Sequence, residues 1–195
     1  MANRTGTYVA FDGLNQTDPT KSDFRYYSTI QAWDANNKID FKFVNSHDKT
    51  NAVRDTSTRE TLEARIRERL SVSKNMLVIL SSDTRKSGSM LVYEIEQAVD
   101  TYKLPLICVY TGYRVVRYVD QLSSRWPTAL STRIGNEAAK AIHIAFAQKP
   151  IFDAIGQFGV NGKVPATAKN YYRPDVYKEW GLLYAWEDEG NLLKS

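Results

Sequence analysis

An uninterrupted apolar run, Met76-Leu77-Val78-Ile79-Leu80, constrains the fold of this chain more than any other feature. A strand with one solvated face alternates apolar and polar residues, whereas a continuous run is typical of a strand covered on both faces. A second buried run, Leu104 to Tyr110, follows after a stretch with helical periodicity. Two covered strands separated by a helix predict a right-handed βαβ unit in a parallel sheet.

Three further runs extend this pattern, and helical patterns separate most of them. They predict an α/β fold, flavodoxin-like in size, with a five-stranded parallel sheet in the order 2-1-3-4-5 flanked by helices. The last strand is expected near the sheet edge, with His143 pointing out of the core. The five strands are expected near residues 8–11, 41–44, 76–80, 105–110 and 141–146.

Two of the helices have recognisable starts. Ser57-x-x-Glu60 is a capping-box pattern, in which two side chains bond free backbone N–H groups at a helix start. The helix after the central strand is expected to run from about Ser87 to Tyr102. Its core face is predicted from the periodicity of Leu91, Ile95, Ala98, Val99 and Tyr102.

Composition excludes several classes of protein. The chain has 195 residues, one cysteine (Cys108), and 26 basic and 22 acidic residues that are well interspersed. A single cysteine forms no disulfide within the chain and favours a reducing, cytoplasmic compartment. No basic cluster suggests nucleic-acid binding, and no run reaches the ~18 apolar residues of a membrane span. His47 and His143 lack partners at metal-ligand spacing, so neither a metal nor another cofactor is predicted.

The character of the chain changes beyond residue 150. Three glycines loosen the segment from 156 to 162, and tyrosines and tryptophans then crowd residues 171–186. We therefore predict a domain at residues 1–150 and a C-terminal extension at residues 151–195. Because exposed aromatics form a sticky patch, the extension is expected to pack on the domain or to form a subunit contact in a homo-oligomer.

In open α/β sheets, ligands bind beyond the carboxyl ends of the strands. Asp12, the loop from Ser81 to Ser87, and Thr111 occupy such positions. At 100° per residue, Glu94 falls at the margin of the apolar stripe of its helix, where a carboxylate could face the crevice partly desolvated. The competing interpretations are a solvated helix glutamate and, for Asp12, an ordinary turn residue.

The stretch from Leu62 to Val109 resembles the TIR-like domain of the Thoeris anti-phage protein ThsB. The segments Asp23-Phe24-Arg25 and Lys103-Leu104-Pro105-Leu106-Ile107 are similar to that family. Val92-x-Glu94-Ile95 matches the end of the TIR signature, although Met90-Leu91 replaces its Trp-Cys pair. Asp12 and Asp83 also depart from the family pattern. The other matching residues are Phe11, Trp33, Ser82, Thr84, Ser87 and Ala98.

The resemblance implies a TIR-like enzyme that cleaves NAD as its substrate, with Glu94 as the catalytic carboxylate. Glu94 would bind the nicotinamide ribose and stabilise the positive charge that develops as nicotinamide leaves. The resemblance further implies that ADP-ribose closes to a cyclic isomer, a diffusible signal for a partner effector that is made after a phage-derived trigger. The implied substrate-binding residues are Phe11, Asp12, Ser82, Asp83, Thr84 and Ser87.

Two alternatives belong to other classes. A non-catalytic TIR-like scaffold would assemble through surface loops and could retain Glu94 and Ser87 by descent. A flavodoxin-like nucleotide-binding module has less support, because the loop after the first strand lacks a phosphate-cradling glycine or hydroxyl cluster.

Overall fold

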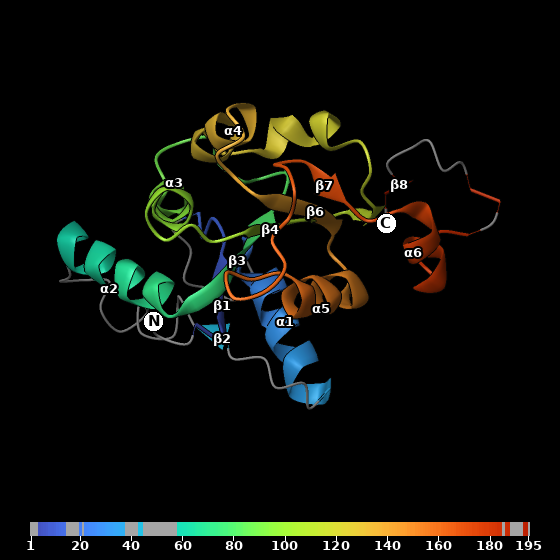
Figure 1. The fold of residues 1–195 in the computed structure, drawn as a ribbon, viewed down its shortest axis with the longest axis horizontal. Helices are drawn as coiled ribbons and strands as arrows, with labels where there is room; N and C mark the ends of the chain where they lie inside the picture. Colours follow the sequence, from blue (N-terminus) through green and yellow to red (C-terminus); the bar gives the residue numbers. More distant parts are fainter. Residues whose placement is uncertain are drawn as a thin grey trace.

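Six strands form one parallel sheet in the order β2-β1-β3-β4-β6-β7 (Figure 1). The computed structural model describes residues 4–14, 20, 22–37, 43–44, 58–184, 186–187 and 193–194. Every neighbouring pair in the sheet is parallel. The strands are β1 Gly6–Ala10, β2 Phe43–Val44, β3 Ser73–Leu80, β4 Leu106–Tyr110, β6 Ala141–Ala145 and β7 Asn170–Tyr171.

The predicted α/β class and parallel sheet are confirmed, with one difference in strand order. The five predicted strands are adjacent in the predicted order, but β7 pairs with β6 and forms the edge. A strand of two residues leaves no periodic signal in the sequence. Residues 41–42 of the predicted second strand lie outside the described residues.

The helices cover the sheet in two layers (Figure 1). On one face lie α1 Phe24–Asn37 and α5 Gln148–Gln157. On the other lie α2 Arg59–Ser71, α3 Met90–Glu96 and α4 Thr128–Gly135. A π-helical turn, Gln97–Thr101, continues α3, and a 3-10 helix, Val119–Arg125, precedes α4.

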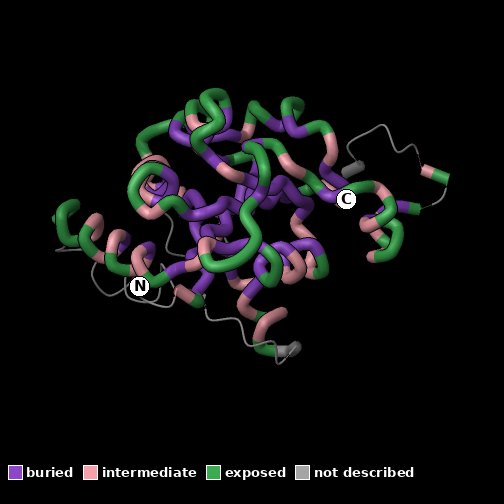
Figure 2. The backbone as a smooth tube through the Cα atoms, viewed as in Figure 1, coloured by how far each residue is buried: buried purple, intermediate pink, exposed green. Residues whose placement is uncertain are grey.

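The continuous apolar runs supply both faces of the sheet. Met76, Val78 and Leu80 of β3 pack under α2, α3 and α4, whereas Leu77 and Ile79 pack against α1 and α5. All five side chains are completely buried. Figure 2 shows buried backbone concentrated in these central strands. The rule that a continuous run is covered on both faces therefore holds here.

His143 corrects the prediction for the last strand. It was expected to point out of the core, but it is completely buried. Its Nδ1 lies 2.7 Å from the Tyr110 hydroxyl and its Nε2 lies 2.9 Å from the Ala168 carbonyl oxygen. Because the Ala168 carbonyl oxygen can only accept, Nε2 carries the proton of the neutral ring. Nδ1 therefore accepts from the Tyr110 hydroxyl, which itself accepts from Trp126 Nε1 over 2.7 Å. Burial lowers the pKa of His143 to about 4.

The C-terminal part of the chain begins with α5, which crosses residue 150. Helix α6, Pro174–Glu179, adds the buried Tyr177 to the α1–α5 side of the core, whereas Trp186 is 81 % exposed. Strand β8, Leu193–Lys194, pairs antiparallel with β5, Tyr113–Val115. The division into residues 1–150 and 151–195 stays a prediction. In the described part of the chain, no helix is both long and apolar enough to span a bilayer.

Candidate active site

The candidate site lies where the strand order reverses. Strand β1 has β2 on one side and β3 on the other, so the loops that follow β1 and β3 meet at the carboxyl edge of the sheet. Asp12 follows β1, and the segment from Ser81 to Ser89 leads from β3 to α3. Asp12 and this segment are 69 to 77 residues apart in sequence, and direct hydrogen bonds join them.

Asp12 joins them through Arg85. Its Oδ2 accepts from the Arg85 backbone N–H at 3.0 Å and from Nε at 2.8 Å. Its Oδ1 accepts from Arg85 Nη2 at 2.7 Å and from the Leu14 N–H at 3.0 Å. Burial raises the pKa of Asp12, but these hydrogen bonds outweigh it and hold the pKa below its usual value. Asp12 is therefore a carboxylate with both oxygens occupied, which fixes the loop before α3.

A second buried carboxylate, Asp23, lies beside this pair. The Thr84 hydroxyl lies 3.5 Å from Asp23 Oδ2 and accepts the Ser81 N–H at 2.9 Å. Burial, with the negative charges of Asp12 and Asp83, raises the pKa of Asp23 to about 6. Thr84 thus connects the end of β3 to the start of α1.

Glu94 lies on the buried side of α3, with only 5 % of its surface exposed. The Tyr8 hydroxyl, which is completely buried on β1, lies 2.6 Å from Glu94 Oε1. Along β1 the side chains alternate, and Tyr8 belongs to the face covered by α2 and α3. The interpretation of Glu94 as a solvated helix residue is therefore excluded.

The environment of Glu94 disfavours its charged form. Burial is the largest cause and raises its pKa from 4.5 to about 7, and the charge of Asp12 acts in the same direction. The Tyr8 hydrogen bond and the charge of Arg69 on α2 oppose this effect. A buried carboxyl group whose pKa is raised toward neutral pH is a frequent feature of functional sites.

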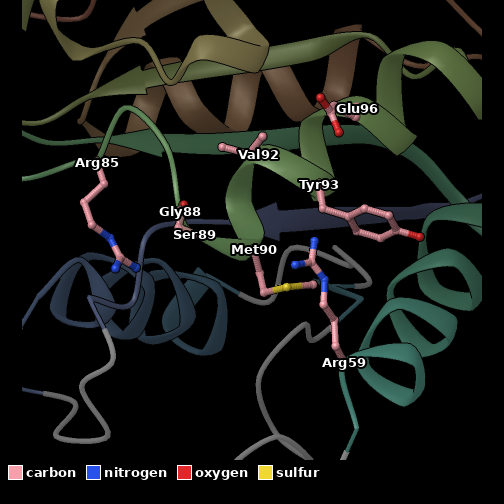
Figure 3. A pocket seen from close by; sticks show the side chains of 8 residues that line it. All are labelled: Arg59, Arg85, Gly88, Ser89, Met90, Val92, Tyr93 and Glu96. Carbon is pink, nitrogen blue, oxygen red and sulfur yellow. The ribbon is translucent and has the colours of Figure 1, made fainter.

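A pocket of about 310 Å³ opens beside α3 (Figure 3). Arg59 extends from the start of α2 toward Met90 and Tyr93 of α3, whereas the Arg85 guanidinium is bound to Asp12. The Tyr93 hydroxyl accepts a 2.6 Å hydrogen bond from Arg67. Glu94 itself is not among the lining residues. The pocket is lined by Arg59, Arg85, Gly88, Ser89, Met90, Val92, Tyr93 and Glu96.

The predicted substrate-binding residues separate into three groups. Asp12 and Thr84 are buried and form the contacts between loops. Ser82, Asp83 and Ser87 are exposed on the β3–α3 loop. Phe11 lies on the opposite face of the sheet, where its ring stacks on Tyr27 with centroids 5.5 Å apart.

The start of α3 also differs from the prediction. The helix begins at Met90 with Ser89 as its N-cap, so Ser87 lies in the loop before the helix and not at its start. Gly88 has φ +78°, a left-handed conformation that ends the loop immediately before the cap.

The N-cap of α2 also lies later in the chain than the capping-box pattern predicted. Thr58 is its N-cap and accepts from the Thr61 N–H, whereas Ser57 lies outside the described residues.

Sequence reasoning missed Tyr8 and Asp23 as parts of this site, and it included Arg85 only as a member of the loop from Ser81 to Ser87. Tyr8 carried one usable signal, because a hydroxyl in a buried strand needs a hydrogen-bond partner. Asp23 and Arg85 gave no signal, since their contacts join segments 61 and 73 residues apart. Among the described residues, no group of three or more His, Cys, Asp or Glu side chains is arranged to hold a metal ion.

The family model for the TIR-like domain of the Thoeris protein ThsB matches residues 8–115. The match covers more than half of the 195 residues and includes the last three residues of β1 and all of β3, α3 and β4. The chain belongs to the Thoeris ThsB TIR-like family. Its resemblance to ThsB is therefore confirmed, and a role in Thoeris defence follows from it. Tyr8, Asp12, Arg85 and Glu94 all lie inside the segment that matches ThsB.

Proposed function

We propose that this ThsB-family chain is an NAD-cleaving enzyme of cytoplasmic anti-phage defence, with Glu94 as its catalytic carboxylate. The observation that carries the proposal is the buried Glu94, held at 2.6 Å by Tyr8 on the helix that follows β3 at the topological switch point. The bond between the ribose carbon and nicotinamide breaks and nicotinamide leaves. A nucleophile within the same ADP-ribosyl group then bonds to that carbon, and a proton is released to solvent. The cyclic ADP-ribose isomer that results signals to a partner effector. A phage-derived trigger starts the reaction.

The proposed chemistry needs a negative charge in a water-poor site. As the bond between nicotinamide and ribose breaks, the ribose gains oxocarbenium character and therefore positive charge. Glu94 attracts this charge more strongly in the transition state than in the ground state, which is the condition for rate acceleration. Burial of Glu94 strengthens the attraction because less water screens it. The ribose has to reach Glu94 through the crevice beside the β3–α3 loop.

Charge and shape beside α3 support a dinucleotide ligand. Arg59 lines the pocket and can balance a pyrophosphate, while Tyr93 offers an aromatic surface. Asp12 and Thr84 support the crevice indirectly, through Arg85 and Asp23. Direct substrate contacts by Phe11, Asp12, Ser82, Asp83, Thr84 and Ser87 stay a prediction.

The test is NAD turnover by wild type and Glu94→Gln with the trigger present, with products resolved by mass spectrometry. Glutamine keeps the shape and removes the charge, so we expect a loss of about 10²–10³ in rate, or about 3–4 kcal/mol. Glu68→Gln, an exposed position on α2, is the matched control and should keep wild-type turnover. Equal NAD consumption by wild type and Glu94→Gln would show that the catalytic assignment is wrong.

The pH dependence gives a second, independent test. Because the carboxylate is the active form and the pKa of Glu94 is about 7, kcat/KM should rise as pH increases through 7. A rate that falls over the same range would assign Glu94 a role as an acid instead. If no variant turns over NAD under any trigger while the effector still assembles with the chain, the non-catalytic scaffold replaces the enzyme.

A further inference from the structure

We propose that Tyr8 is the positioning residue of Glu94: its hydroxyl fixes one carboxylate oxygen and leaves the other for the substrate ribose. This inference rests on the proposed function for its catalytic consequence, but the hydrogen bond and its effect on Glu94 can be measured without turnover. Tyr8 and Glu94 are 86 residues apart in sequence and come from β1 and α3.

The surroundings of Tyr8 give its hydroxyl a specific task. Tyr8 is completely buried in a layer that is otherwise formed mainly by aliphatic side chains, including Met76 and Val78 of β3. A phenylalanine would fill the same space without requiring a polar partner. The hydroxyl lies 2.6 Å from Glu94 Oε1, within the 2.5–2.7 Å range of an O–H group bound to a charged oxygen.

The direction of this hydrogen bond follows from the acidity of the two groups. Burial, followed by the charge of Glu94, raises the pKa of the Tyr8 hydroxyl well above its usual value, so Tyr8 keeps its proton. When Glu94 is ionised, Tyr8 therefore donates and Oε1 accepts. The bond stabilises the carboxylate against burial, and the rigid position of β1 in the sheet limits rotation of the carboxylate.

Other charges also act on Glu94, and the test has to separate them from Tyr8. Arg69 on α2 favours the carboxylate, and Asp12 after β1 disfavours it. Arg69 and Asp12 affect the pKa of Glu94 through their charges, whereas Tyr8 affects it through a hydrogen bond. Replacing Tyr8 leaves both charges in place, so a change in the titration of Glu94 reports the hydroxyl.

The experiment compares wild type with Tyr8→Phe by following the ¹³Cδ signal of Glu94 during a pH titration, with Glu94→Gln used to assign the signal. Loss of the donor should shift the titration midpoint of Glu94 to higher pH, at a proton concentration about tenfold lower. A hydrogen bond to a charged group stabilises that group by about this factor. The acid limb of kcat/KM should move by the same factor. An unchanged midpoint would overturn the proposal.

Tyr110→Phe is the matched control. Tyr110 is also completely buried on this face of the sheet, but its hydroxyl bonds Trp126 and His143 instead of Glu94. It should lose stability without moving the Glu94 midpoint. If it moves that midpoint as much as Tyr8→Phe does, the effect comes from general loosening and the proposal fails.

Incorporation of 3-fluorotyrosine at position 8 covers the case in which Tyr8→Phe does not fold. A more acidic phenol is a stronger donor, so the Glu94 midpoint should move in the opposite direction, to a higher proton concentration. A midpoint that does not move, or moves the other way, overturns the proposal. A shifted midpoint in protein that never cleaves NAD would support the positioning contact and contradict the proposed function, so the two failures are distinguishable.

Discussion

Replacement of Glu94 by glutamine should change the pH dependence of folding stability by an amount that the structure specifies. Burial raises the pKa of Glu94 from 4.5 to about 7. The folded chain therefore binds this proton more tightly than the unfolded chain. Its stabilising contribution is complete below pH 4.5 and is lost as pH rises to about 7. The ratio of the two proton affinities corresponds to about 3 kcal/mol.

The assay is urea unfolding of wild type and Glu94→Gln between pH 4.5 and 8, followed by circular dichroism. Other groups titrate in both proteins and cancel in the difference. As pH rises across this range, the free energy of unfolding of wild type should fall by about 3 kcal/mol relative to that of the variant. Glu96, whose side chain is 43 % exposed, provides the control. The difference in unfolding free energy between wild type and Glu96→Gln should vary by less than ~0.5 kcal/mol over the same range. A Glu94→Gln difference that is constant with pH would refute the conclusion that burial dominates at Glu94.

Three further predictions concern other buried groups. His143 should remain neutral with the proton on Nε2 at pH 6, in ¹⁵N spectra of the ring. Because its folded pKa of about 4 lies below the ordinary 6.5, its contribution to stability should be lost as pH falls from 6.5 to 4, and a charged ring at pH 6 would contradict this. Asp12→Asn should destabilise the fold by about 2–4 kcal/mol and speed amide exchange in residues 81–89, because it breaks the bidentate contact with Arg85. A loss below ~0.5 kcal/mol would mean that this contact does not hold the loop. Cys108 is completely buried and burial raises its pKa, so it should react with a thiol reagent only after denaturation. Rapid reaction of the native protein would argue against the packing of β4.

The fold was largely predictable because its signals are local. The run from Met76 to Leu80 identified a strand covered on both faces, and the positions of Leu91 and Ile95 identified the buried side of α3. Periodicity reports which face of an element is buried, and alternation of strands with helices restricts the topology. Strand β7 was not predicted, because two residues are too few to show a periodic pattern. His143 was misassigned because the sequence does not show that β7 and the segment around Trp126 cover its strand.

The candidate site was only partly predictable, and the reason is physical. Sequence alone proposed Glu94 as a candidate, through its place at the margin of an apolar stripe and its match to a family motif. It determined that a carboxylate lies on the helix after the central strand. Tertiary structure decided that this carboxylate is buried, titrates near pH 7 and is bonded to Tyr8. It also decided that both oxygens of Asp12 are occupied by Arg85 and Leu14. Burial and hydrogen bonding depend on which distant segments fold against a residue, and one sequence encodes those contacts only through the whole fold.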